Sequence, residues 1–75
     1  MSNVITTTPW FSGDEKPMQH RPGPYERDYG DGNFFCWWDG SFYGYPALTP
    51  ETARRTFALY GYSTKQNLPW RGVMK

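Results

Sequence analysis

The sequence contains one cysteine, one histidine and no long apolar run. A single cysteine cannot form an intrachain disulfide, and a secreted domain of 75 residues would normally need several. No segment approaches the roughly 20 apolar residues of a membrane-spanning helix, and the first residues lack the charged-then-apolar pattern of a secretory signal. The composition therefore predicts a protein of the reducing cytoplasm with no membrane partner.

The sequence also has few groups that could perform catalysis or bind a metal. Cys36 lies between Phe35 and Trp37, where a thiol behaves as a small apolar side chain, and His20 lies in a proline-rich segment. These two residues cannot supply the four clustered ligands of a zinc site. The acidic residues of 28–33 lack the distal glutamate of a calcium loop and are typical of turns. We expect no enzyme activity, no cofactor and no metal.

Positive and negative side chains are nearly equal in number, with 8 Lys or Arg and 7 Asp or Glu. The formal net charge is +1, which creates no broad attraction for nucleic acid. Any contact with nucleic acid is therefore expected to be secondary to another partner.

Aromatic residues are abundant, at 4 Trp, 6 Tyr and 5 Phe, whereas aliphatic residues are scattered. A chain of this length buries only about 60% of its unfolded surface, so large side chains must form the core. Each aromatic side chain can bury about 150–250 Å². The sequence predicts an aromatic core, and more rings than that core can enclose.

The segment from Asn33 to Tyr45 carries the strongest local signal. Its Asp39-Gly40 pair lies between aromatic residues, which predicts a tight β-hairpin turn. Alternate residues of such a hairpin occupy opposite faces. One face is predicted to carry Phe34, Cys36, Trp38, Tyr43 and Tyr45, and the other Phe35, Trp37 and Phe42.

The flanking segments complete an α+β prediction. Residues 24–29 alternate as in a strand, and Gly30 to Gly32 turn the chain into the hairpin, which gives a three-stranded antiparallel meander. Thr49 as N-cap and Gly61 as stop predict one helix over about 50–60 that packs on the sheet, with Ala53, Phe57 and Tyr60 inward. We expect a loosely ordered, extended arm over 1–23, a βββα core over 24–61 and a tail over 62–75.

Candidate partner-binding residues follow from the surplus of aromatic side chains. Phe35, Trp37 and Phe42 could form an interface hot spot, unless the arm or the tail covers them. Arg54 and Arg55 on the outer helix face could pair with acidic groups, or form an ordinary solvated surface. The remaining candidates lie in the arm and the tail, where they either plug the sheet or form recognition motifs: Trp10, Trp70 and Arg71.

Several short motifs resemble those of a set of very small phage and prophage proteins. Trp38-Asp39-Gly40 and 66–72 (Gln-Asn-Leu-Pro-Trp-Arg-Gly) are the distinctive ones, and shorter elements match at 9–12, 16–17 and 23–27. Where that set often has Trp after Trp-Asp-Gly, this chain has Tyr43, which keeps an aromatic residue in the hairpin. Within the set, the sequence is similar to small RNA-polymerase-binding transcription regulators of lytic phages of plant pathogens.

The resemblance implies a bacteriophage protein that binds host bacterial RNA polymerase, inhibits initiation and promotes antitermination in the host cytoplasm. A host elongation factor is a further expected partner, and the free protein is expected to be a monomer. Two alternatives stay open. The chain could be a small phage inhibitor of another host protein, or it could be a single-stranded nucleic-acid-binding module whose exposed rings stack on bases.

Overall fold

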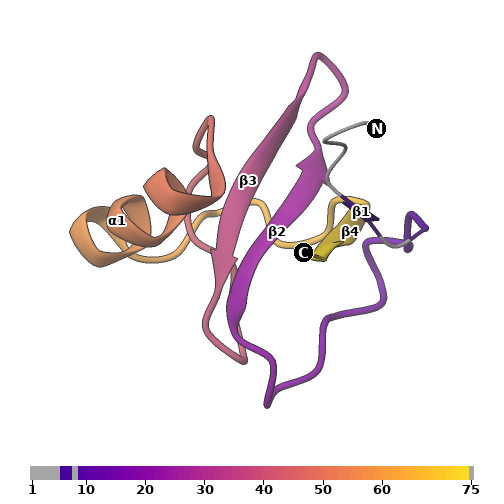
Figure 1. Ribbon diagram of the computed structural model, residues 1–75, viewed down its shortest axis with the longest axis horizontal. Helices are drawn as coiled ribbons and strands as arrows, with labels where there is room; N and C mark the ends of the chain where they lie inside the picture. Colours follow the sequence, from indigo (N-terminus) through magenta and orange to yellow (C-terminus); the bar gives the residue numbers. More distant parts are fainter. Residues whose placement is uncertain (1–5, 8, 75) are drawn as a thin grey trace.

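An antiparallel sheet of four strands with one helix beside it forms the structure (Figure 1). The structure is a computed structural model that describes residues 6–7 and 9–74. The strands are β1 (Thr6–Thr7), β2 (Gly23–Asp28), β3 (Asn33–Trp38) and β4 (Trp70–Met74), in the spatial order β1-β4-β2-β3. The helix α1 spans Pro50–Tyr60. The predicted α+β class is confirmed.

The hairpin of β2 and β3 follows directly from its turn residues. The Tyr29 amide donates to the Gly32 carbonyl at 2.9 Å, and the Asp28 carboxylate accepts a hydrogen bond from the Gly30 amide at 2.8 Å. Gly30 has a φ of 90°, which only glycine adopts easily. The predicted turn from Gly30 to Gly32 is confirmed, and it pairs Tyr25 with Cys36 across the two strands.

The second predicted hairpin differs in detail. The Asp39 amide donates to the Phe42 carbonyl, so Gly40 and Ser41 occupy the centre of the turn and Trp38 pairs with Tyr43. The predicted register paired Cys36 with Tyr43. A shift of two residues still leaves Trp38 and Tyr43 on one face, because faces alternate with a period of two.

The third regular strand was predicted wrongly at 41–45. In the structure the third regular strand is β4, which pairs with the edge of β2 away from β3, so the sheet is not a meander. Residues 43–47 still line the outer edge of β3 through single bridges, with Phe35 opposite Ala47. Tyr45 and Pro46 then share the position opposite Cys36, which is a bulge. An extra residue and a proline without an N–H group interrupt a regular ladder there.

The core lies on the sheet face that carries Tyr25, and both ends of the chain help to close it. Its buried cluster consists of Cys36, Trp38, Tyr43 and Trp70. Phe11 stacks on Trp70 at 4.6 Å between ring centres, and the two backbones exchange both possible hydrogen bonds. The segment predicted as a loosely ordered arm therefore lies, over 9–23, against the sheet, and the predicted tail supplies a central core residue.

The helix begins and ends at its predicted residues. The Thr49 hydroxyl accepts a hydrogen bond from the Thr52 amide at 3.1 Å, and the Gly61 amide donates to the Phe57 carbonyl. Helix α1 contacts β3 and β2. Ala53 is fully buried and Phe57 half-buried, as predicted, but Tyr60 is 69% exposed. The inward prediction for Tyr60 is wrong, because its ring packs against the exposed ring of Tyr45 instead of the sheet.

We predict that Trp70→Ala lowers the free energy of unfolding by about 3–5 kcal/mol, because it removes a buried ring that contacts Phe11 and Tyr25. Urea unfolding followed by far-ultraviolet circular dichroism measures the change. The matched control is Leu59→Ala on the exposed surface of α1, expected within about 0.5 kcal/mol of the unmodified protein. Similar losses in both variants would contradict the central place of Trp70.

Candidate interaction surface

The described residues contain no group of three or more His, Cys, Asp or Glu side chains that could hold a metal ion. Within the same part of the chain, no helix is long and apolar enough to cross a bilayer. Cys36 is fully buried, and His20 lies exposed on a loop. The features that stand out are exposed aromatic rings and the arginines beside them.

Most predicted contact residues gather on the sheet face opposite the core. Cross-strand partners share a face, and Glu26 pairs with Phe35 on one side and with Arg71 on the other. Trp37 lies two residues from Phe35 and therefore on the same face. We call Glu26, Phe35, Trp37 and Arg71 the outer face. Phe11 of the arm and Trp70 of the tail pack on the core face, away from Phe35 and Trp37. Phe35 and Trp37 are half-buried on the face of β3 beside α1.

Two arginine–aromatic pairs border this outer face. The Arg54 guanidinium of α1 lies 5.7 Å from the centre of the Trp37 ring. The Arg71 guanidinium lies 4.5 Å from the centre of the Trp10 ring and donates to the Glu26 carboxylate at 2.8 Å. Because Trp10 is 40% exposed, this second pair stays accessible. The structure thus brings five predicted contact residues to one face: Trp10, Phe35, Trp37, Arg54 and Arg71.

The other predicted contact residues are placed differently. Trp70 belongs to the buried core on the opposite face, and Arg55 is exposed on α1. Phe42 lies beyond the turn after β3, is 49% exposed and packs on Tyr62 at 5.0 Å between ring centres. Of the eight candidates, Trp70 alone is enclosed by the protein's own interior.

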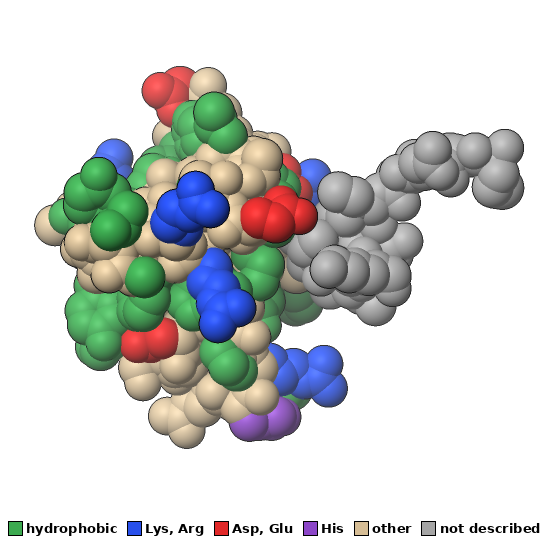
Figure 2. Space-filling model, turned by 60° about the vertical axis from the view of Figure 1, so that its left-hand side comes forward, with side chains coloured by type: hydrophobic (Ala, Val, Ile, Leu, Met, Phe, Trp, Pro, Cys, Tyr) green, Lys and Arg blue, Asp and Glu red, His purple; other side chains and the backbone are tan. Residues whose placement is uncertain are grey.

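An exposed cluster of rings lies near the end of α1, and sequence reasoning had found only one of its members. We call it the aromatic surface: Phe42, Tyr45, Tyr60 and Tyr62. Tyr62 contacts both Phe42 and the half-buried Phe57, and Tyr60 contacts Tyr45. Figure 2, which turns the helix side of Figure 1 toward the viewer, shows hydrophobic side chains gathered on this side with Lys or Arg beside them. The available signal was the pair of tyrosines, Tyr60 and Tyr62, on either side of the helix stop at Gly61.

The Asp39 carboxylate holds two members of the aromatic surface in place. One oxygen accepts hydrogen bonds from the Ser41 and Phe42 amides, both at 2.8 Å, and the other accepts one from the Tyr62 hydroxyl at 3.1 Å. Burial, the largest single influence, raises the pKa of Asp39, but the hydrogen bonds together outweigh it and lower that pKa below its usual value. The ionised carboxylate therefore stabilises this turn.

We predict that Asp39→Ala lowers the free energy of unfolding at neutral pH by about 1–2 kcal/mol, because three donors lose a charged acceptor. Asp39→Asn is the control that keeps an acceptor but removes the charge. A lowered folded pKa gives stability that is present above the unfolded pKa of about 3.9 and lost as the pH falls through the folded pKa. In urea unfolding, the unmodified protein should therefore exceed Asp39→Asn in stability near neutral pH and lose that advantage as the pH falls through the folded pKa of Asp39. A pH-independent difference would contradict this.

A fully buried arginine lies on the core face. Arg27 is 0% exposed, and two of its three guanidinium nitrogens have no hydrogen-bond partner among the described residues. Its third nitrogen contacts the Cys36 sulfur at 3.7 Å, and its guanidinium lies 3.9 Å from the centre of the Tyr43 ring. Burial raises the pKa of Tyr43, although the Arg27 charge lowers it, so the phenol stays neutral and supplies no counter-charge.

We predict that Arg27→Met raises the free energy of unfolding by about 1 kcal/mol or more. An apolar chain of similar length removes the desolvation cost of a buried charge that no carboxylate of the described residues offsets. Thermal and urea unfolding measure the difference. Arg54→Met on α1, where the guanidinium is exposed, is the matched control and should change stability little. A loss of stability in Arg27→Met would show that the contact with Tyr43 outweighs the desolvation cost.

Comparison with known protein families, with characterised proteins and with solved structures finds no match to this chain.

Proposed function

We propose that this protein is a phage-encoded transcription regulator that docks onto host bacterial RNA polymerase in the host cytoplasm, where it inhibits initiation and promotes antitermination. The observation that carries the docking part of the proposal is the aromatic surface. Phe42, Tyr60 and Tyr62 are each about half exposed or more, although the core is already closed by Trp38, Tyr43 and Trp70.

Rings outside a closed core favour an interaction with another protein. Leaving large apolar groups in water costs free energy, and interfaces are enriched in Tyr, Trp, Phe and Arg. The outer face adds Trp37 and Trp10, each with an arginine beside it. Paired arginine and aromatic groups are typical of interface hot spots. Within the described residues there is no competing metal cluster, which leaves recognition as the chemistry best supported.

RNA polymerase as the partner is supported by the resemblance of the motifs, which have structural roles in this chain. The Gln66 side chain accepts from the Tyr43 amide at 2.9 Å and donates to the Tyr43 carbonyl at 3.0 Å. The Asn67 side chain accepts a hydrogen bond from Lys16 at 2.8 Å, and Trp70 lies in the core. Because the motif residues hold this fold together, their resemblance supports a shared fold with the phage regulators. A shared fold in turn supports a shared partner, RNA polymerase, and we propose a host elongation factor as a further component of the complex.

The test is retention of polymerase from a lysate of a plant-pathogenic bacterium by the tagged full-length protein. We expect polymerase subunits to be retained, and purified polymerase to show lower promoter output and greater terminator readthrough when the protein is added. Tyr60→Ser and Phe42→Ser should each weaken binding by about tenfold or more, because each removes an exposed ring. The matched control is Asp31→Ser in the β2–β3 turn, which should bind normally.

Each alternative outcome has a defined meaning. Absence of polymerase from the retained material, with another host protein in its place, would overturn the proposal in favour of an inhibitor of that protein. Oligonucleotide binding that falls steeply with salt, without polymerase retention, would favour a single-stranded nucleic-acid-binding module. Equal polymerase binding by the Tyr60 and Phe42 variants would remove the aromatic surface from the proposal.

A further inference from the structure

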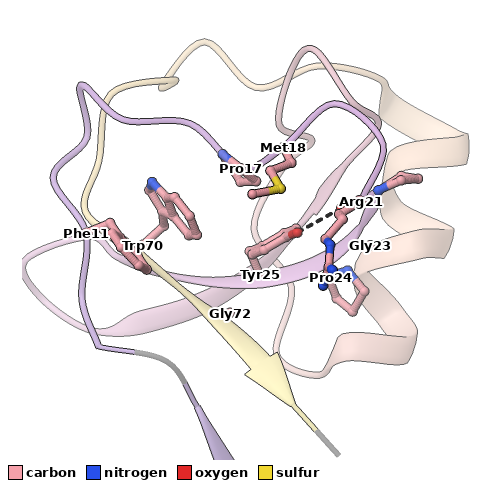
Figure 3. Close-up of a pocket in the computed structure, with 10 residues that line it drawn as sticks. Phe11, Pro17, Met18, Arg21, Gly23, Pro24, Tyr25, Trp70 and Gly72 are labelled. Carbon is pink, nitrogen blue, oxygen red and sulfur yellow. Dashed lines mark hydrogen bonds between the residues drawn. The ribbon is translucent and has the colours of Figure 1, made fainter.

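An open hollow of about 590 Å³ lies on the core face of the sheet, away from the outer face (Figure 3). Its bottom is formed by Gly23 of β2 and Gly72 of β4, which have no side chains to fill the space. The sides are the rings of Tyr25 and Trp70 and the loop over 17–22 that crosses above the sheet. A volume of this size is within the range of ligand-binding pockets, about 300–1,000 Å³.

Hydrogen bonds from the sheet hold this loop in position, so the hollow is already formed in the free protein. The Trp70 indole donates to the Glu15 carbonyl at 2.7 Å, and the Trp38 indole donates to the Met18 carbonyl at 3.2 Å. The Tyr25 hydroxyl donates to the Arg21 carbonyl at 2.8 Å, as Figure 3 shows. A preformed site avoids the ordering cost that a flexible loop would add to binding.

The same hydrogen bonds leave the hollow with few polar groups for a guest. The ring donors of Tyr25 and Trp70 are already used within the protein. Three lining residues, Pro17, Pro22 and Pro24, have no backbone N–H group. A small-molecule site normally orients its ligand with several placed polar groups, and this hollow lacks them. It is therefore suited to an apolar side chain presented by a larger partner.

The charge at the rim restricts that partner further. Among the described residues that line the hollow, Arg21 is the one that carries a charge, and it is exposed. The ion pair found within the described residues, between Arg71 and Glu26, does not involve it. A guanidinium beside an apolar hollow is complementary to a carboxylate next to an apolar side chain.

We propose that this hollow binds an acidic peptide segment of a partner protein, with one aromatic or large aliphatic side chain inserted beside Tyr25 and a neighbouring carboxylate against Arg21. The site goes beyond the proposed function, because it lies on the opposite face of the sheet from Phe35 and Trp37. Its partner is specified only by the apolar and acidic side chains that the hollow would bind.

The probe is the synthetic peptide acetyl-Asp-Phe-Asp-Glu-amide, titrated into the isotope-labelled full-length protein and followed by NMR. We expect saturable shifts of the Gly23 and Gly72 amides and of the Trp70 indole N–H. Replacing the peptide's phenylalanine by alanine, or using Arg21→Glu, should each weaken binding by about tenfold or more. Lys65→Glu is the matched control, since it reverses an exposed charge outside the hollow, and it should bind as the unmodified protein does.

Three results would overturn the inference. They are the absence of saturable shifts at the hollow, equal binding of a peptide with lysine in place of its acidic residues, and undiminished binding by Arg21→Glu. None of them bears on polymerase retention, which tests the proposed function through Tyr60 and Phe42 on other parts of the molecule. Failure of one proposal is therefore distinguishable from failure of the other.

Discussion

The packing of Trp70, from the C-terminal strand, against Phe11 and Tyr25 is the interaction on which the fold depends. Its backbone extends the sheet beside β2 and bridges to Phe11, and its ring stacks on Phe11 and meets the edge of Tyr25. Its indole N–H also holds the Glu15 carbonyl. One residue thus brings the C-terminal strand, the N-terminal segment and the sheet together. A chain this short needs such multiple contacts because little other surface is available for burial.

The two faces of the sheet serve different purposes as a result. The core face carries Cys36, Trp38 and Tyr43 under the N-terminal segment, and it also encloses the buried charge of Arg27. The outer face is only partly covered by α1, which leaves Trp37 half-buried and accessible to Arg54. The rings of the aromatic surface are buried on neither face and lie around the turn at Asp39 and the end of α1. Because Phe11 and Trp70 close the core face, their rings leave the outer face uncovered.

The two proposed contact regions also differ in how they are built. The aromatic surface consists of side chains on a turn and a helix end, held through the Asp39 carboxylate and by contacts among the rings. The hollow is bounded by backbone and by rings whose donors are already used. The aromatic surface therefore offers exposed rings that carry polar hydroxyl groups. The hollow offers a shaped apolar space with the Arg21 guanidinium at its rim. Such different surfaces are suited to different partners, or to separate parts of one assembly.

Local chemistry in the sequence determined the elements whose hydrogen bonds close within a few residues. The glycines of 30–32 determined the β2–β3 turn, Thr49 and Gly61 determined the ends of α1, and Asp39 determined the next chain reversal. Alternation along β3 also placed Phe35 and Trp37 on one face correctly. Tertiary structure alone decided that the third regular strand is β4 beside β2 and not 41–45 beside β3. It also decided that Tyr60 stays outside, and that Trp10 and Arg71 join Phe35 on the outer face. These outcomes depend on pairings between distant segments, where a one-residue bulge at Tyr45 and Pro46 and the burial of one indole outweigh local propensity.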